Sequence, residues 1–122
     1  MALPINRAVD EIVVQARMAD VAATTSCWAV APCKGRLRRM YSVIHGTVNG
    51  DAVISVAIAG ATALTDTLTI ANTSTAGTVD SVEFSQGPLY TSVVEGDKID
   101  VDSDGGGSTT VIADFYLVIE KT

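Results

Sequence analysis

The sequence predicts an all-β protein: a β-sandwich or jelly-roll-like body of about seven or eight strands, with an N-terminal arm or short helix. Three observations predict this fold class. The 122 residues suit a single domain, and 48% of them are hydrophobic whereas 18% are charged. The 16 Val, 9 Ile and 14 Thr are residue types that favour pleated strands. Short apolar runs also alternate with turn signals at roughly ten-residue spacing.

The predicted strands begin after residue 23, and we expect residues 24–122 to form the sandwich domain. Apolar runs, most of them alternating with polar residues, indicate strands over residues 25–31, 36–48, 52–58, 66–70, 79–84, 97–102 and 111–120. The dipeptide Asn49-Gly50 separates the second and third of these runs. Because Asn-Gly is a strong signal for a two-residue turn, it predicts a hairpin there.

Residues 1–23 have a different pattern, and we expect them to form an N-terminal arm or helix. Their apolar residues recur at helical spacing. The adjacent β-branched residues Val13 and Val14 weaken a helix, so an extended arm is equally compatible. No hairpin partner lies next to this segment in the sequence, so it could reach a neighbouring subunit. Ile12 and Val13 are therefore candidate interface residues.

The net charge of −6 is unevenly distributed along the chain. Residues 1–45 hold six basic and three acidic residues, whereas residues 46–122 hold two basic and eleven acidic ones. This asymmetry indicates two faces with different neighbours. We expect no nucleic-acid partner, because phosphate binding draws on many positive charges and the chain is acidic overall.

The sequence also predicts neither a membrane partner nor export. No stretch approaches the ~20 consecutive apolar residues that a membrane helix needs. The N-terminus lacks the continuous apolar region of a signal peptide, which favours synthesis in a cytoplasm. Cys27 and Cys33 match no metal-binding spacing and are expected to be buried thiols. A disulfide remains the alternative if the two lie on adjacent strands.

The motif Asp100-Val-Asp102-Ser-Asp104-Gly105 matches the first half of an EF-hand calcium loop. The position that needs a bidentate glutamate is occupied by Val111, so the match fails in its second half. Apolar residues alternate with the three aspartates, which also fits the solvent-exposed face of a strand. Asp100, Asp102 and Asp104 are therefore weak calcium candidates only, and we expect no metal and no cofactor.

No constellation of catalytic groups is evident, and we expect the protein not to be an enzyme. His45 is the only histidine, and no serine lies in a nucleophile elbow. The basic residues Arg36, Arg38 and Arg39 suit either contact with an acidic partner or a solvated strand edge. Trp28 suits a core or an interface better than a ligand platform.

Three segments resemble small head decoration (cement) proteins of tailed double-stranded DNA bacteriophages. They are WAVAPCKGRLRRMYSVI at residues 28–44, AGTVD at 76–80 and EGDKIDVDSDGG at 95–106. The resemblance covers residues 24–122. It implies a β-sandwich or jelly-roll body on the outer surface of an icosahedral capsid. Such proteins act as dimers or trimers that bridge major capsid proteins and stabilise the shell, and they have no catalytic residues.

On this interpretation the capsid or subunit interface is formed by Ile12, Val13, Trp28, Arg36, Arg38 and Arg39. The expected partners are the major capsid protein and further copies of the chain, and the expected location is the outside of the virion. The alternative is a carbohydrate- or receptor-binding β module of a phage fibre or tail. Six aromatic residues in the whole chain make this alternative less favoured, because sugar sites usually expose aromatic rings.

Overall fold

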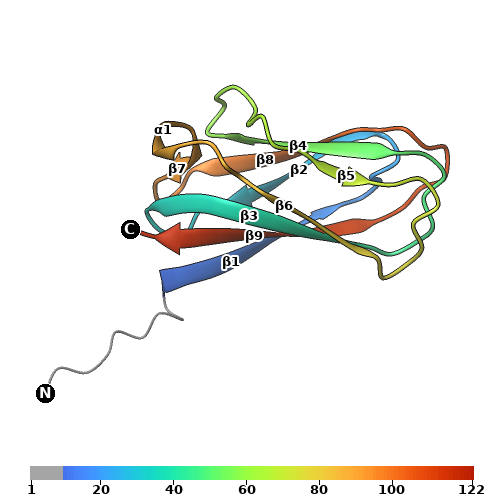
Figure 1. The fold of residues 1–122 in the computed structure, drawn as a ribbon, viewed down its shortest axis with the longest axis horizontal. Coiled ribbons are helices and arrows are strands. Elements are labelled where there is room, and N and C mark those ends of the chain that lie inside the picture. Colours follow the sequence, from blue (N-terminus) through green and yellow to red (C-terminus); the bar gives the residue numbers. More distant parts are fainter. Residues whose placement is uncertain (1–9) are drawn as a thin grey trace, which may run out of the picture.

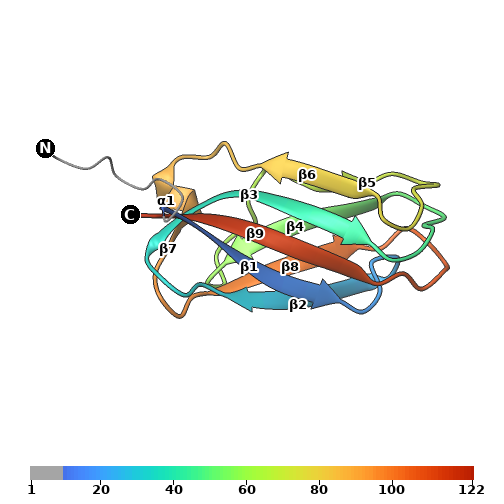
Figure 2. The same cartoon turned by 90° about the horizontal axis from the view of Figure 1, so that it is seen from below.

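Two antiparallel β-sheets pack face to face in the computed structural model, which describes residues 10–122 (Figure 1). The elements are β1 (Glu11–Met18), β2 (Thr24–Val30), β3 (Gly35–Ile44), β4 (Ala52–Ile58), β5 (Leu68–Ile70), β6 (Val79–Glu83), α1 (Pro88–Thr91), β7 (Ser92–Val93), β8 (Lys98–Asp104) and β9 (Ala113–Lys121). Sheet A has the order β1-β9-β3-β6, and β7 also pairs with β3. Sheet B has the order β2-β8-β4-β5. Figure 2 shows sheet A in front, with β9 between β1 and β3.

The strand order is that of a jelly roll. If the two-residue β7 is set aside, every connection except β4–β5 crosses from one sheet to the other. The last long strand, β9, lies between the first and the third, as Greek-key connections require. The predicted all-β sandwich or jelly-roll fold is therefore confirmed.

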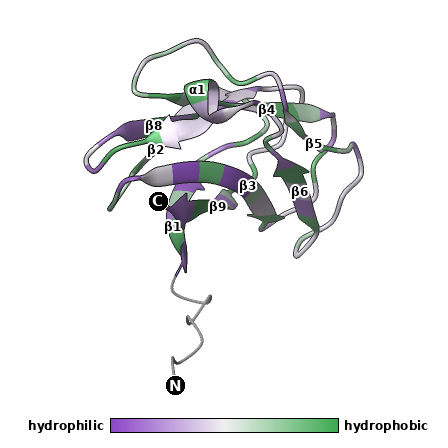
Figure 3. Ribbon diagram, turned by 60° about the vertical axis from the view of Figure 1, so that its left-hand side comes forward, coloured by the Kyte–Doolittle hydropathy of each residue, from purple (hydrophilic) through white to green (hydrophobic). Residues whose placement is uncertain are grey.

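The core lies between the sheets and is built by alternation along each strand. Figure 3 shows hydrophobic and hydrophilic residues alternating along β3. In β9, Phe115, Leu117 and Ile119 are fully buried, and Ile99 and Val101 of β8 face them from the other sheet. Burial of each such large side chain stabilises the fold by about 1.5–3 kcal/mol. Within the described residues, no helix is long and apolar enough to cross a membrane.

The N-terminal segment differs from the expected arm or helix over residues 11–18. β1 pairs antiparallel with β9 along its whole length and forms the edge of sheet A. Ala16 and Met18 are buried, whereas Arg17 between them and Val13 and Gln15 before them are exposed. The two-residue alternation of apolar and polar side chains that marks a strand is hard to recognise here, because the inward side chains are small near the middle of β1. The sandwich therefore begins at β1, and residues 1–9 lie outside the described residues.

The hairpin predicted at Asn49-Gly50 is wrong, because β3 and β4 lie in different sheets. Asn49 and Gly50 instead contact the loop at residues 106–108, which is distant in the sequence. Ser108 donates its backbone N–H to Asn49 Oδ1 at 2.9 Å, and Asn49 Nδ2 donates to Ser108 Oγ at 2.7 Å. A Cβ added to Gly50 would lie 1.7 Å from the carbonyl oxygen of Gly106, so only glycine permits this approach.

Candidate interaction surface

A β-bulge in β3 determines how three arginines are presented on the outer face of sheet A. The pairing of β3 with β9 shifts register between Leu37 and Arg39, which makes Arg38 an extra residue. Strict alternation would place either Arg38 or Arg39 in the core. The bulge keeps Leu37 and Met40 fully buried while Arg36, Arg38 and Arg39 stay partly exposed on the outside.

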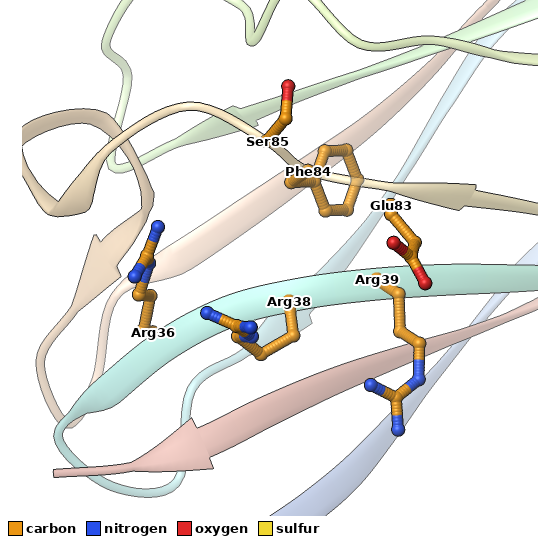
Figure 4. Close-up of a pocket in the computed structure, with 6 residues that line it drawn as sticks. All are labelled: Arg36, Arg38, Arg39, Glu83, Phe84 and Ser85. Atoms are coloured by element: carbon orange, nitrogen blue, oxygen red, sulfur yellow. The ribbon is translucent and has the colours of Figure 1, made fainter.

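These three arginines line a hollow of about 240 Å³ together with Glu83, Phe84 and Ser85 (Figure 4). The hollow lies between β3 and the segment that follows β6. In Figure 4 the Arg38 side chain extends along β3 toward Arg36, whereas Arg39 reaches across β9. The lining residues include three arginines and one carboxylate, Glu83, and although the Arg39 guanidinium points away across β9, the remaining positive charge of Arg36 and Arg38 favours an anionic group.

Two of the three guanidinium groups are held by neighbours within the chain. Arg36 Nε donates to Thr91 Oγ1 at 3.0 Å, and its Nη2 donates to the backbone oxygen of Gln86 at 3.0 Å. Arg39 Nη2 donates to Glu11 Oε1 at 3.0 Å. A hydrogen bond with Tyr41 is the main reason that the pKa of Arg39 is raised, and Glu11 adds to this effect.

Arg38 differs from its two neighbours. Within residues 10–122 its guanidinium group has neither a hydrogen-bond partner nor an ion-pair partner. Its backbone oxygen accepts from the Phe84 N–H at 2.9 Å, which holds the bulge against the chain after β6. Arg38 is thus half-buried, its backbone is held by the bond to Phe84, and its guanidinium has no partner among residues 10–122. Such an arginine is suited to bind a carboxylate of another molecule.

Apolar side chains flank the hollow on the same face. Val13 lies opposite Val118, which lies opposite Arg39. Tyr116 lies opposite Tyr41 in the next row of the sheet. Val13 is 56% exposed, so it extends the surface across β1. The structure thus brings Val13 together with Arg36, Arg38 and Arg39, as the list of candidate interface residues required.

Two other candidates do not join this surface. Ile12 lies on the core-facing side of β1, opposite the buried Ile119. Trp28 lies on the outer face of sheet B, where it is opposite Asp100, and its side chain is 57% exposed. The arginines and Trp28 therefore occupy opposite faces of the sandwich, so the expected basic surface that bears the tryptophan is not formed.

The three calcium candidates lie along the outer face of β8, where two of them accept hydrogen bonds and Asp100 Oδ1 is buried without a hydrogen-bond partner among the described residues. Ser26 Oγ donates to Asp102 Oδ1 at 2.5 Å, and a backbone N–H of β4 donates to Asp104 at 2.9 Å. Asp100 lies 3.8 Å from Lys98 Nζ. Among residues 10–122 no group of three or more His, Cys, Asp or Glu side chains is arranged to hold a metal ion. Residues 100–104 of the calcium-loop motif instead belong to β8, and their three aspartates make its outer face acidic.

A charged cluster that sequence reasoning missed lies at the other end of sheet A. Arg17 donates to both carboxylate oxygens of the buried Asp114, at 2.8 and 3.0 Å. His45 Nε2 lies 2.7 Å from Asp114 Oδ2. The Arg17 hydrogen bond, aided by His45 and opposed by burial, holds the pKa of Asp114 well below its ordinary value. No local motif reveals the cluster, because Arg17 and Asp114 are 97 positions apart.

Both cysteines are free, so the disulfide alternative is not realised. Cys27 is buried in β2, and Cys33 is half-buried in the connection to β3. Burial, with a contribution from Asp102, raises the pKa of the Cys27 thiol to about 11. Cys27 is therefore a protonated, unreactive thiol at neutral pH, in keeping with a small apolar core residue.

Comparisons with known proteins give structural likeness only. No protein-family model matches the chain. No curated protein matches its sequence. A chain in the acidic stable capsid structure of Helicobacter pylori bacteriophage KHP30 superposes with a TM-score of 0.57 and 9% identity, over 90% of this chain and 86% of that one.

Carbohydrate-binding modules have the same fold. CsCBM6-3 from Clostridium stercorarium, solved with cellobiose, gives a TM-score of 0.55 and 13% identity over 87% of this chain and 74% of that one. A CBM35 from Cellvibrio japonicus gives 0.52 and 12% over 92% of this chain and 98% of that one. The chain therefore has a β-sandwich fold that is found both in a phage capsid and in carbohydrate-binding modules.

Proposed function

We propose that the chain is a decoration protein of a tailed phage head, which binds the outer surface of the shell and bridges neighbouring major capsid proteins. The observation that carries this proposal is Arg38, whose guanidinium has no partner among residues 10–122 and lies in a basic hollow, on a sheet face that also exposes Val13 and Tyr41. Arginine and tyrosine beside apolar side chains are typical of protein interfaces. The resemblance of residues 28–44, 76–80 and 95–106 to decoration proteins supports it, as does the fold of the KHP30 capsid chain.

The chemistry of the hollow defines the partner surface. Arginine pairs with carboxylates in a bidentate geometry, so the proposed contact on the shell is acidic. The chain would act as a dimer or trimer, and many modest contacts over the lattice would add up through avidity. Its role in this proposal is binding rather than catalysis, which needs shape and charge but no reactive group.

The test uses expanded heads that lack the protein. We expect purified protein to bind them in a fixed ratio in a sedimentation assay and to raise their resistance to heat. Arg38→Gln should weaken this binding about tenfold, the effect of losing ~1.4 kcal/mol of a charge-assisted contact. Lys98→Gln is the matched control, because it removes the same charge from the exposed outer face of sheet B. Failure of the wild-type protein to bind heads would contradict the proposal.

Trp28 favours a second candidate function, a carbohydrate-binding module of a fibre or tail. Its indole is 57% exposed and lies opposite Asp100, next to the row that holds Ser26 and Asp102. Sugar rings stack on exposed indoles, and carboxylates and hydroxyls bind their hydroxyl groups. The shared fold of CsCBM6-3 and the Cellvibrio japonicus CBM35 supports this candidate.

A glycan array, followed by calorimetry with cellobiose as a defined probe, separates the two candidates. Sugar binding through Trp28 predicts that Trp28→Ala abolishes binding whereas Arg38→Gln retains it. An array without any bound glycan would count against this second function and leave the first untouched.

A further inference from the structure

The segment around α1 carries exposed apolar side chains that the core does not use. Leu89 is 87% exposed, Tyr90 59% and Val94 55%, and Leu89 is the most exposed large hydrophobic residue within residues 10–122. A single exposed leucine is ordinary on a protein surface. Leu89 and Tyr90 are consecutive residues of α1, and Val94 follows β7, so three large apolar side chains are exposed within six positions of the chain. Exposed apolar side chains beyond the ordinary scatter of single residues point to an interaction site.

The segment is rigid although it is exposed. The N–H groups of Tyr90 and Thr91 donate to the Gly87 carbonyl at 3.0 and 3.3 Å, and Ser92 Oγ donates to the Pro88 carbonyl at 2.5 Å. Pro88 at the start of α1 restricts the backbone further. Thr91 and Val93 are buried and fasten the segment to the body. An apolar group that is already ordered loses little entropy on binding, so this geometry suits an anchor.

Arg36 connects the segment to the basic hollow. Its Nε bonds Thr91 Oγ1 inside α1, and its Nη2 bonds the Gln86 carbonyl just before it. The same side chain lines the hollow with Arg38. Through Arg36, the segment that carries the exposed apolar side chains is therefore bonded to one of the residues that line the hollow. Figure 1 shows α1 at the end of the molecule where β3 begins. A partner that covers Leu89 and Tyr90 meets the positive charge of Arg36 and Arg38 on the side of β3, which favours carboxylates there, whereas Glu95 and Asp97 lie beside Val94.

We infer that Leu89 and Tyr90 form an anchor that inserts into an apolar socket, rimmed by carboxylates, on the shell protein. This inference rests on the proposed decoration function and names the contact that would dominate it. A second copy meeting this surface about a two-fold axis would bring Arg36 and Arg38 of both subunits together, and such like-charge contact is unfavourable. The charge of the surface therefore favours an acidic partner over self-association.

The experiment compares Leu89→Ser and the double variant Leu89→Ser/Tyr90→Ser with the wild-type protein on expanded heads that lack it. The matched control is Val30→Ser, because Val30 is 60% exposed but lies on sheet B. We expect Leu89→Ser to weaken binding about 10- to 100-fold, the range set by loss of one buried leucine side chain, and the double variant to bind still more weakly. Val30→Ser should bind like the wild type.

Thermal unfolding and solution mass, measured on every variant, complete the design. Unchanged melting temperatures show that a binding loss is not a folding loss. Equal binding by wild type and both anchor variants would overturn the anchor while leaving the decoration function intact. No binding by the wild type would overturn both. A lower solution mass of the anchor variants would overturn the assignment to the shell, because it would make Leu89 and Tyr90 a contact between subunits.

Discussion

The two outer faces of the sandwich carry charge in different ways. On sheet B, Asp102 and Asp104 accept hydrogen bonds from neighbouring strands, and Asp100 lies 3.8 Å from Lys98 Nζ although its Oδ1 accepts no hydrogen bond among the described residues. On sheet A, a bulge projects three arginines into a hollow, and Arg38 has no hydrogen-bond or ion-pair partner among the described residues. Satisfied charge contributes to the fold, whereas unpaired, partly buried charge is available to bind. The difference therefore locates the proposed interface on sheet A.

The strongest test of this comparison replaces one carboxylate on each face. Asp114→Asn on sheet A should lower the free energy of unfolding by about 1–2 kcal/mol, since it leaves a buried group with poorer partners, although the exposed Arg17 limits the loss. Asp102→Asn on sheet B, which is less buried, should lower it by less than about 0.5 kcal/mol. Urea unfolding at pH 7 measures both. Equal losses would show that the burial of Asp114 and its bonds to Arg17 and His45 add nothing beyond the single hydrogen bond that Asp102 accepts from Ser26.

The pH dependence of stability sharpens the same contrast. The pKa of Asp114 is lowered below its ordinary value of 3.8, so the folded state favours the charged carboxylate. This stabilisation is complete above about pH 5 and is lost progressively as the pH falls through 3.8 toward the lower folded pKa. Melting temperatures between pH 7 and pH 2 should fall less steeply for Asp114→Asn than for the wild type. Identical acid slopes would contradict the assignment.

Substitution of Arg36 should lower the stability less than substitution of Asp114. Its effect should be concentrated in the segment around α1. Arg36→Gln removes bonds to Thr91 and Gln86 and should cost about 1 kcal/mol of unfolding free energy. The release of α1 should also speed proteolytic cleavage between residues 86 and 92, which limited proteolysis with mass spectrometry would detect. Lys98→Gln on sheet B is the control, and it should leave the cleavage rate unchanged.

The smallest stability effects are expected at the two side chains proposed for binding. Arg38→Gln and Trp28→Ala should each change the unfolding free energy by no more than about 0.5 kcal/mol, since Arg38 has no side-chain partner in the described part of the chain and Trp28 is exposed. A large loss at Arg38 would show that its guanidinium supports the bulge rather than remaining available for a partner. A large loss at Trp28 would show that the indole packs against sheet B.

Sequence patterns located β2 to β6, β8 and β9 because apolar and polar side chains alternate in most of them, whereas the two-residue β7 is too short to show a pattern. In β8 and β9 a large apolar residue occupies nearly every second position, and the register of burial follows directly. β1 escaped this reasoning because alanine occupies one of its buried positions and valines lie on both of its faces. Asn49-Gly50 was read as a hairpin turn, since a local dipeptide carries no information about which sheet the next strand enters.

The interaction surface was only partly predictable. The run of arginines indicated a basic contact, but alternation alone places one of Arg38 and Arg39 inside the protein. The bulge that resolves this conflict depends on the pairing of β3 with β9, whose residues are about eighty positions apart in the sequence. The Arg17–Asp114 pair and the Arg36–Thr91 bond depend on long-range contacts in the same way.

The sequence by itself determined the fold class, the acidic balance and the residues that could form a basic surface, because composition and periodicity are local properties. Only the tertiary structure decided that Trp28 and the arginines lie on opposite faces, that Asp102 and Asp104 accept hydrogen bonds from neighbouring strands, and that Arg36 of the hollow is bonded to the segment around α1. These outcomes depend on which strands pair and in what register. Strand pairing joins distant segments through backbone hydrogen bonds and core packing, which no short window of sequence specifies.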